Sequence, residues 1–189
     1  MNDVPALSVV CPVYCNAPSL RELATRVGDA AGDAGLSHEL ILVIDGSPDS
    51  SAEEAHEIAT GDPAVGVLVL ISNHGQHRAL RAGLARCRGK SIVIMDADLQ
   101  DPPEVIPTLL AELRDGVEVA FAGRHGRYQR IDRMITSRLF KIMQSFVCGV
   151  PTDAGTYAAL TDDAVARLLE HDNPGHMTLP QQIGLLALS

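Results

Sequence analysis

Runs of apolar residues recur along the chain at intervals that predict alternating β-strands and α-helices. Five runs are rich in Val, Ile and Leu and contain few polar residues, which is typical of strands buried on both faces of a sheet. These runs cover residues 7–11, 40–44, 65–71, 92–95 and 117–122. Three- and four-residue spacing predicts helices between them, at residues 20–34, 52–59, 76–88 and 104–114. This alternation predicts an α/β domain with a mainly parallel sheet sandwiched by helices.

The C-terminal part of the chain predicts further elements. Residues 131–147 carry an apolar helical stripe with flanking basic residues, which fits either packing on the sheet or an amphipathic helix at a membrane surface. Residues 153–160 predict a short strand or turn, and Thr161 or Asp162 is a suitable cap for the helix that follows. Residues 176–189 show no closing strand. We therefore expect a single domain over residues 1–189 that is short at its C-terminus.

Polar residues follow three of the predicted strands at the points where those strands end. In open α/β sheets, ligands bind at the carboxyl ends of the strands, so these residues are expected to converge on one crevice. The three segments are Pro12-Val13-Tyr14, Asp45-Gly46-Ser47 and Asp96-Ala97-Asp98.

The last of these segments is the best candidate for a metal site. Side chains alternate along a strand, so Asp96 and Asp98, which are two residues apart, are expected to point to the same side. Two such carboxylates repel unless a cation lies between them, and Mg²⁺ or Mn²⁺ takes oxygen ligands and bridges carboxylates to substrate phosphates. Gln100 could add a third oxygen. The alternative is that both aspartates are turn residues that cap a strand.

Composition and charge narrow the function. The 189 residues are 46% hydrophobic with a formal net charge of −9, which excludes a disordered tail and argues against nucleic-acid binding. Residues 124–141 are an exception, because they contain six Arg or Lys residues and one acid, Asp132. Four cysteines show no zinc-site spacing. No signal peptide or membrane-spanning run is visible, so we expect a cytoplasmic protein that either is free or lies peripherally at the inner face of the membrane.

Several motifs occur together in an order that resembles a known family. The segments are Leu7–Tyr14 around Pro12-Val13-Tyr14, Leu40–Asp49 around Asp45-Gly46-Ser47, Asn73-His74-Gly75-Gln76, Met95–Glu104 and Asp153–Tyr157. Across roughly residues 7–170, this order resembles glycosyltransferase family two proteins with a GT-A fold. The resemblance is greatest to the branch that moves sugars onto polyprenyl phosphates, such as dolichol-phosphate mannose synthases and bactoprenol glucosyltransferases.

The resemblance implies an inverting glycosyltransferase that uses Mg²⁺ or Mn²⁺ and a UDP- or GDP-sugar, with a lipid phosphate as acceptor. It implies site residues of four kinds. The nucleotide would contact Pro12, Tyr14, Asp45 and Asp96; the metal would bind Asp96, Asp98 and Gln100; the catalytic residues would be Asp98 and Asp153; and the acceptor phosphate would bind Arg124 and Arg138. Taken singly, Asp45 also fits an ordinary turn, Asp153 a structural cap, and each arginine a solvated surface position.

Two positions depart from the family pattern, and other functions stay open. Asn16 stands where the family often has Glu, and Ile44 stands where it often has Asp; both positions normally help to hold the base and ribose. A soluble or polysaccharide acceptor is one alternative. A degenerate, non-catalytic nucleotide-sugar-binding module is another, although the retained Asp96, Asp98 and Gln100 argue against it. Rossmann dehydrogenases and P-loop proteins are excluded, because neither glycine motif is present.

Overall fold

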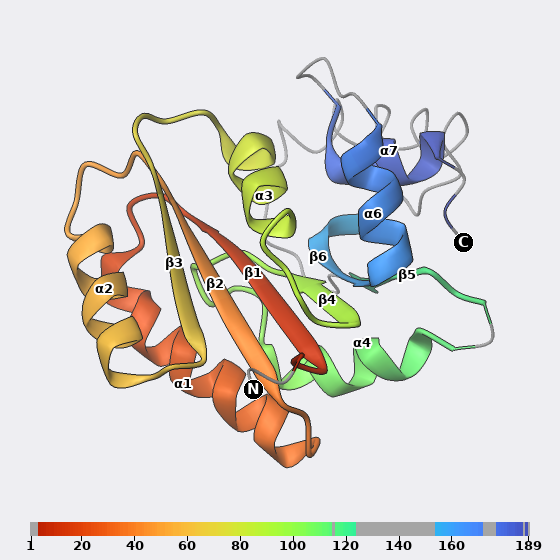
Figure 1. The fold of residues 1–189 in the computed structure, drawn as a ribbon, viewed down its shortest axis with the longest axis horizontal. Helices are drawn as coiled ribbons and strands as arrows, with labels where there is room; N and C mark the ends of the chain where they lie inside the picture. The colour runs from red at the N-terminus through yellow and green to blue at the C-terminus, as the bar shows by residue number, and fades with distance from the viewer. Residues whose placement is uncertain (1–3, 115, 124–153, 172–176, 187, 189) are drawn as a thin grey trace, which may run out of the picture.

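The described part of the chain forms a six-stranded sheet in the order β3-β2-β1-β4-β6-β5 (Figure 1). The computed structural model describes residues 4–114, 116–123, 154–171, 177–186 and 188. The strands are β1 (Leu7–Val13), β2 (His38–Asp45), β3 (Val65–Leu70), β4 (Ser91–Ile94), β5 (Val119–Gly123) and β6 (Ala154–Thr161). The first four are parallel, whereas β6 runs antiparallel to both β4 and β5.

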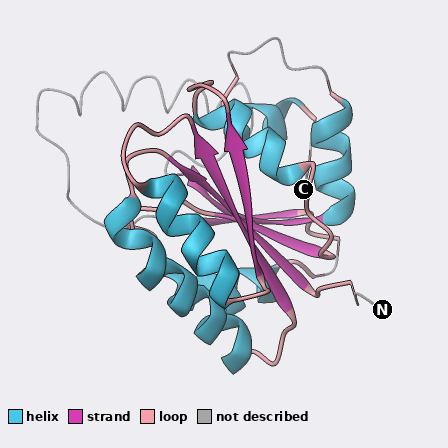
Figure 2. Ribbon diagram, turned by 60° about the vertical axis from the view of Figure 1, so that its left-hand side comes forward, coloured by secondary structure: helices cyan, strands magenta, loops and turns pink. Residues whose placement is uncertain are grey.

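Helices cover both faces of this sheet, as Figure 2 shows with the sheet between two groups of helices. One group comprises α1 (Ala17–Asp33), α2 (Ser51–Gly61), the 3₁₀ turn η1 (Pro103–Val105) and α4 (Ile106–Glu112). The other comprises α3 (Gln76–Leu84), α6 (Asp162–Glu170) and α7 (Leu179–Leu185). The predicted α/β architecture with a mainly parallel sheet is therefore confirmed.

Side-chain alternation along the strands divides the core into two layers. In β2, Leu42 and Ile44 pack under α1 and α2, whereas Ile41 and Val43 pack under α3. Since every second residue points the same way, Asp45 falls on the α3 face of the sheet. The same parity buries Ile44 to 1% exposure in the α1 and α2 layer. The departure from the family pattern at this position is therefore accommodated as a core residue.

Several predicted boundaries change, and one change affects the site. The strand predicted at residues 92–95 ends at Ile94, so Asp96 and Asp98 follow the strand in a turn. The argument that strand alternation aligns these two carboxylates was therefore wrong. The segment predicted as a short strand or turn is β6, which is eight residues long and lies inside the sheet beside β4. The Thr161 hydroxyl accepts a hydrogen bond from Ala164 N at 3.2 Å, which confirms the predicted cap of α6.

Candidate functional site

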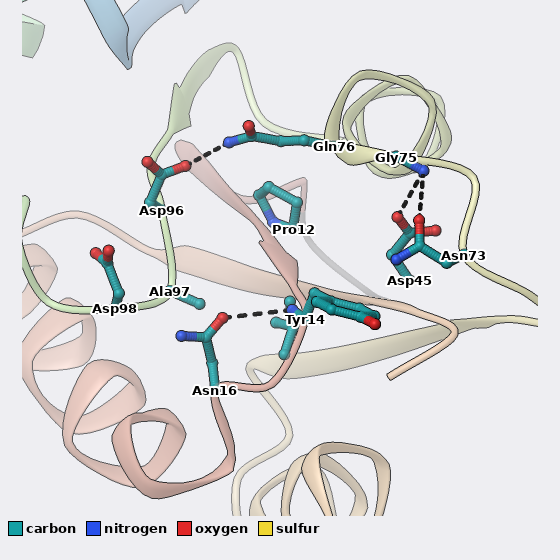
Figure 3. A pocket seen from close by; sticks show the side chains of 11 residues that line it. Pro12, Tyr14, Asn16, Asp45, Asn73, Gly75, Gln76, Asp96, Ala97 and Asp98 are labelled. Atoms are coloured by element: carbon teal, nitrogen blue, oxygen red, sulfur yellow. Dashed lines mark hydrogen bonds between the residues drawn. The ribbon is translucent and has the colours of Figure 1, made fainter. Parts of the chain in front are cut away.

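A cleft of about 410 Å³ opens at the carboxyl ends of β1, β2 and β4 (Figure 3). It is lined by Pro12, Val13, Tyr14, Asn16, Asp45, Asn73, Gly75, Gln76, Asp96, Ala97 and Asp98. Figure 3 shows Asp96 and Asp98 at one end of the cleft and Asp45 and Asn73 at the other, with Pro12 between them. The three predicted strand ends thus do converge on one crevice. Its elongated arrangement of polar groups suits a ligand with chemically different ends.

Asp45 holds the loop that leads into α3. Its carboxylate accepts hydrogen bonds from His74 N at 2.7 Å and Gly75 N at 2.8 Å, and its residue is 3% exposed. Hydrogen bonds from backbone amides to a carboxylate are among the stronger neutral-to-charged contacts in proteins. Asp45 therefore has a structural task in fixing residues 74–75, in addition to lining the cleft.

Gly46 allows this loop to approach the end of β2. Its φ of 58° lies in the left-handed region, and a Cβ atom there would overlap the backbone of Ser72 and Asn73. Glycine avoids both the strain and the overlap. The Asp45-Gly46 pair, which the sequence presented as a simple turn, thus brings the end of β2 and the start of α3 together at the cleft.

Asp96 is held by side chains from two other elements. The Gln76 amide of α3 donates to Asp96 Oδ1 at 2.6 Å, and the Thr156 hydroxyl of β6 lies 3.4 and 3.3 Å from its two oxygens. The turn itself is tied to α1, because the Ser19 hydroxyl donates to Ala97 O at 2.6 Å. Asp98 is exposed, and its carboxylate accepts a hydrogen bond from Gln100 N at 3.0 Å.

The donor set at this end of the cleft suits a hard divalent cation. Within the described part of the chain, no group of three or more His, Cys, Asp or Glu is arranged to hold a metal by itself. Mg²⁺ and Mn²⁺ do not need such a cage, because they are commonly bound through one or two carboxylates plus substrate phosphates and water. Asp96 and Asp98 supply those two carboxylates on one wall of the cleft. Gln100 is exposed and is not among the residues that line it.

Strained backbone occurs at two positions next to residues that line the cleft. Cys15 and Leu99 have positive φ values of 57° and 61°, and they are the non-glycine residues with this conformation in the described chain. Cys15 lies between Tyr14 and Asn16, and Leu99 follows Asp98 directly. A non-glycine residue in this region costs of the order of 1–3 kcal/mol, and such residues cluster at binding and catalytic sites.

A buried thiol lies beneath the site. Cys11 of β1 is fully buried, and burial, followed by the nearby charges of Asp96 and Asp101, raises its pKa. The thiol is therefore protonated at neutral pH and packs as a small apolar group.

Of the predicted site residues, the structure brings Pro12, Tyr14, Asp45, Asp96 and Asp98 together around the cleft. Asp153, Arg124, Arg138 and the predicted helix at residues 131–147 lie outside the described residues, so their placement stays a prediction.

Sequence reasoning did not assign several other residues that contribute to the site. They are Asn73, Gly75, Gln76 and Thr156. The signal for the first three was the Asn73-His74-Gly75-Gln76 turn before α3, which was noted only as part of the family resemblance.

The fold is that of a GT-A domain, and comparison with known proteins identifies its family. The sequence profile described as "Glycosyl transferase family 2" matches residues 8–169. The chain therefore belongs to glycosyl transferase family 2. This confirms the family resemblance inferred from the order of the motifs.

Relatives with a described activity share substantial sequence with the chain. It is 38% identical over 154 residues to the undecaprenyl-phosphate 4-deoxy-4-formamido-L-arabinose transferase of Pseudomonas fluorescens, covering 80% of this chain and 45% of that protein. It is 40% identical over 137 residues to the protein of the same description from Klebsiella pneumoniae, covering 72% of this chain and 42% of that one. The chain thus spans less than half the length of these relatives.

Solved structures support the fold. A mannosyltransferase from Pyrobaculum calidifontis in complex with GDP-Man and Mn²⁺ aligns with a TM-score of 0.66 at 19% identity, over 97% of this chain and 51% of that one. Glucosyl-3-phosphoglycerate synthase from Mycobacterium tuberculosis, in complex with Mn²⁺, UDP and phosphoglyceric acid, aligns with a TM-score of 0.65 at 20% identity, over 86% of this chain and 58% of that one. At these identities the likeness establishes the fold alone.

Proposed function

We propose that this domain transfers a sugar from a nucleotide-diphosphate sugar to a polyprenyl phosphate, with inversion at the anomeric carbon. The observation that carries the proposal is the cleft at three strand ends, with paired carboxylates at one end and Asp45 and Asn73 at the other. A nucleotide sugar has matching parts, namely a neutral base and ribose at one end, followed by an anionic diphosphate that carries the sugar.

In this proposal the nucleoside lies along Pro12, Tyr14 and Asp45, and the diphosphate lies towards Asp96 and Asp98. Tyr14 is 49% exposed beside the cleft and offers an aromatic surface for the base. Asp96 and Asp98 would hold Mg²⁺ or Mn²⁺, with Gln100 as a candidate third oxygen donor. The bound cation would neutralise the charge that develops on the departing diphosphate.

The orientation of Asp96 suits this task. A carboxylate offers about four lone-pair positions, so the hydrogen bond from Gln76 fixes its direction without using its capacity to bind a cation. Asp98 is exposed and extends the same wall. The uncharged Gln76 amide adds no positive charge that would compete with the cation.

A phosphate acceptor would need positioning more than activation. A phosphate monoester is already anionic near neutral pH, so it needs little help from a general base, and the main requirement is alignment with the anomeric carbon. Arg124 and Arg138 are proposed to bind this phosphate, because a guanidinium forms paired hydrogen bonds with phosphate oxygens. Asp153 is proposed to orient the acceptor. The relatives described as undecaprenyl-phosphate transferases support a lipid phosphate as the acceptor.

A lipid acceptor would bring the domain to a membrane surface. No helix in the described ranges is long and apolar enough to cross a membrane. Residues 131–147, with their apolar stripe and basic residues, are the proposed contact with anionic lipid, and each cation there would contribute on the order of 1 kcal/mol. We propose a location at the inner face of the cell membrane.

A transfer assay tests the function. The protein is incubated with Mn²⁺ and a panel of UDP- and GDP-sugars, with and without undecaprenyl phosphate, and the lipid-linked product is separated and quantified. The proposal expects transfer that requires both Mn²⁺ and the lipid phosphate. Nucleotide-sugar binding without transfer to the lipid, combined with transfer to a soluble acceptor, would refute a lipid phosphate as the acceptor. It would leave the nucleotide sugar as the donor.

A further inference from the structure

Three consecutive backbone amides after β1 are all bound by side chains of residues 47–51, which form the loop after β2 and the first position of α2. Cys15 N donates to Ser47 Oγ at 2.7 Å, and Asn16 N donates to Ser51 Oγ at 3.2 Å. Ala17 N donates to Asp49 Oδ2 at 3.3 Å. A turn whose successive amides are all bound by one neighbouring segment is held more firmly than a turn whose amides bind only water.

Asp49 is the centre of this arrangement. Its Oδ1 accepts from the Ser47 hydroxyl at 2.6 Å and from Ser51 N at 3.1 Å, while its Oδ2 accepts from Ala17 N. Ala17 and Ser51 are the first residues of α1 and α2. One carboxylate therefore binds the first amide of two helices, where negative charge is favoured by both helix dipoles.

The side chains at the N-cap positions of α1 and α2 do not cap these helices. Asn16 and Ser50 occupy the cap positions of α1 and α2, and neither side chain makes a capping hydrogen bond. Burial alone would raise the pKa of Asp49, but hydrogen bonds from Ser47, Ser51 and Ala17 outweigh it and lower the pKa to about 2. Asp49 is therefore charged at all working pH values.

The turn that Asp49 holds carries two residues of the cleft. Cys15 adopts a φ of 57°, a conformation that a non-glycine residue keeps only when its surroundings enforce it. Tyr14 and Asn16, on either side of Cys15, line the cleft, and Asn16 Oδ1 accepts from Tyr14 N at 3.3 Å (Figure 3). A change in the Cys15 backbone would move both side chains, because they are attached at its two ends.

We infer that Asp49 is a positioning residue that, through Ser47 and the amides of residues 15–17, holds Tyr14 and Asn16 in the shape that the ligand cleft requires. Asp49 itself does not line the cleft. We call the hydrogen bonds from the amides of residues 15–17 to Ser47, Asp49 and Ser51 the clamp. The clamp is observed as contacts within the protein, whereas its consequence for nucleotide binding rests on the proposed function.

Amide hydrogen exchange, followed by NMR, tests the clamp without any ligand. In Asp49→Asn one carboxylate oxygen becomes an amino group that cannot accept from the clamped amides. We expect exchange at Cys15, Asn16 and Ala17 to accelerate by at least about tenfold, the factor that corresponds to about 1.4 kcal/mol. Amides in the middle of β1 should keep their protection.

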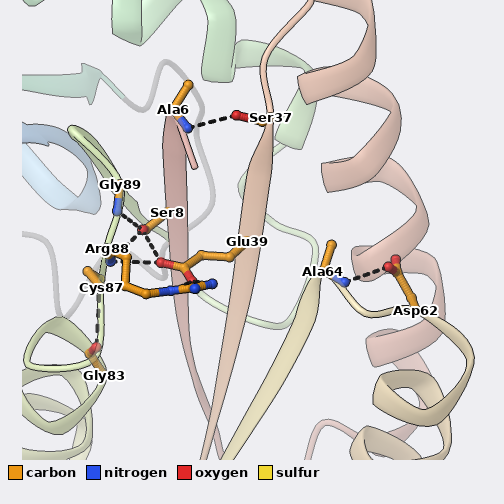
Figure 4. Close-up of polar contacts among 10 residues, drawn as sticks. All are labelled: Ala6, Ser8, Ser37, Glu39, Asp62, Ala64, Gly83, Cys87, Arg88 and Gly89. Carbon is orange, nitrogen blue, oxygen red and sulfur yellow. Dashed lines mark hydrogen bonds and ion pairs between the residues drawn. The ribbon is translucent and has the colours of Figure 1, made fainter. Parts of the chain in front are cut away.

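Asp62→Asn is the matched control. Asp62 Oδ1 accepts a hydrogen bond from Ala64 N at 2.8 Å in the loop before β3 (Figure 4). This loop lies at the amino end of β3, whereas the cleft lies at the carboxyl ends of β1, β2 and β4. Asp62→Asn replaces a carboxylate oxygen in a similar turn that is not part of the clamp, so residues 15–17 should keep wild-type exchange. Ser47→Ala is a second clamp variant, in which the Cys15 amide should lose more protection than the Ala17 amide.

Binding of UDP and GDP in the presence of Mn²⁺, measured by calorimetry on the same variants, tests the consequence. We expect Asp49→Asn to weaken nucleotide affinity by about tenfold, while Asp62→Asn leaves it unchanged. Addition of Mn²⁺ alone should give the same response in the wild type, Asp49→Asn and Asp62→Asn, because both substitutions leave the Asp96 and Asp98 carboxylates in place.

The outcomes separate this inference from the proposed function. Unchanged exchange at residues 15–17 in Asp49→Asn would overturn the clamp, as would equal acceleration in Asp62→Asn. Accelerated exchange with unchanged nucleotide affinity would overturn the positioning role. If Asp49→Asn unfolds altogether, the pattern in Ser47→Ala decides. A wild-type protein that binds neither nucleotide would contradict the proposed function and the role in nucleotide binding, while the exchange data would still decide the clamp.

Discussion

The side-chain amide of Gln76 donates a hydrogen bond to Asp96 Oδ1 at 2.6 Å and so joins the start of α3 to the end of β4 (Figure 3). The contact forms part of a longer connection. Asp45 at the end of β2 binds the amides of His74 and Gly75, and those residues place Gln76 at the first position of α3. The two ends of the cleft are therefore connected through three consecutive residues, His74, Gly75 and Gln76.

Replacing Gln76 by Ala should weaken Mn²⁺-dependent nucleotide binding, because Asp96 would lose the contact that sets its direction. A hydrogen bond to a charged group is worth about 1.5–3 kcal/mol, and Thr156 would still restrain Asp96, so we expect a loss of about tenfold. Gln181→Ala is the control, since its side chain accepts from Thr178 N at 2.7 Å in a helix cap of α7. Calorimetry on both variants makes the comparison, and equal affinities would show that Gln76 does not orient Asp96.

Replacing Gly46 by Ala should destabilise the protein by more than about 2 kcal/mol. The left-handed conformation alone costs about 1–2 kcal/mol for a non-glycine residue, and the added methyl group would overlap the Ser72 and Asn73 backbone. Gly32→Ala in α1 is the control, because nothing lies within 4 Å of the added Cβ atom. That change should be neutral or stabilising by up to about 1 kcal/mol. Urea unfolding measures both, and similar effects of the two changes would refute this account of the loop.

A partly buried ion pair near the amino ends of β1 and β2 should make stability depend on pH. Glu39 accepts from the Ser8 hydroxyl at 2.6 Å and from Arg88 Nε and Nη2 at 2.9 and 2.7 Å (Figure 4). Burial would raise the pKa of Glu39, but these hydrogen bonds outweigh it and lower the pKa below its usual value. A lowered carboxyl pKa stabilises the fold above the unfolded pKa, and this stabilisation is lost as the pH falls through the folded pKa.

Arg88→Met should therefore cost about 1–2 kcal/mol at pH 7, the lower part of the range for charged hydrogen bonds, because the Arg88 side chain is 53% exposed. The cost should shrink as the pH falls through the lowered pKa of Glu39, where the carboxylate becomes protonated in the folded protein. Arg26→Met is the control, since Arg26 pairs with Glu104 at the surface and should contribute about 1 kcal/mol or less. Urea unfolding at several pH values measures the loss in free energy of unfolding for both variants. A cost that does not vary with pH would contradict the role of the Glu39 charge.

Arg138→Ala should impair sugar transfer much more than donor binding, because the proposed partner of Arg138 is the acceptor phosphate. Losing a hydrogen bond to a charged group should cost about 1.5–3 kcal/mol in the transfer step. Arg130→Ala in the same basic segment is the control and should change transfer little. Steady-state kinetics with varied lipid phosphate, alongside calorimetry with the nucleotide, separates the two effects. An equal loss of donor affinity would assign Arg138 to the nucleotide instead.

The sheet could be predicted because its parallel strands are continuous apolar runs with helices between them. The position of β6 could not, because Ala154–Thr161 pairs with β4 residues that lie 64 to 70 positions earlier, and no local pattern specifies that partner. The turn at Asp96 was misassigned because Met95 continues the apolar run beyond the last residue of β4, although its amide still donates to Val10 O.

The candidate site could be predicted at the level of strand ends. Pro12, Asp45 and Asp96 each follow an apolar run, and the rule that parallel strands present their carboxyl ends together places them in one crevice. The contacts between loops could not be predicted in this way. The Asp49 and Gln76 contacts join segments that are distant in sequence, and Asp or Gln next to a helix start is common enough to carry no signal alone.

The central claim is that Asp96 and Asp98 bind a divalent cation that in turn binds a nucleoside diphosphate. Calorimetric titration of UDP and GDP into wild-type protein and Asp98→Ala, each with Mn²⁺ and with EDTA, tests it most directly. Asp163→Ala, in the first turn of α6, is the control for removing an exposed carboxylate. The account predicts Mn²⁺-dependent binding in the wild type and in Asp163→Ala, and no metal-dependent binding in a folded Asp98→Ala protein. Unchanged Mn²⁺-dependent affinity in Asp98→Ala would contradict it.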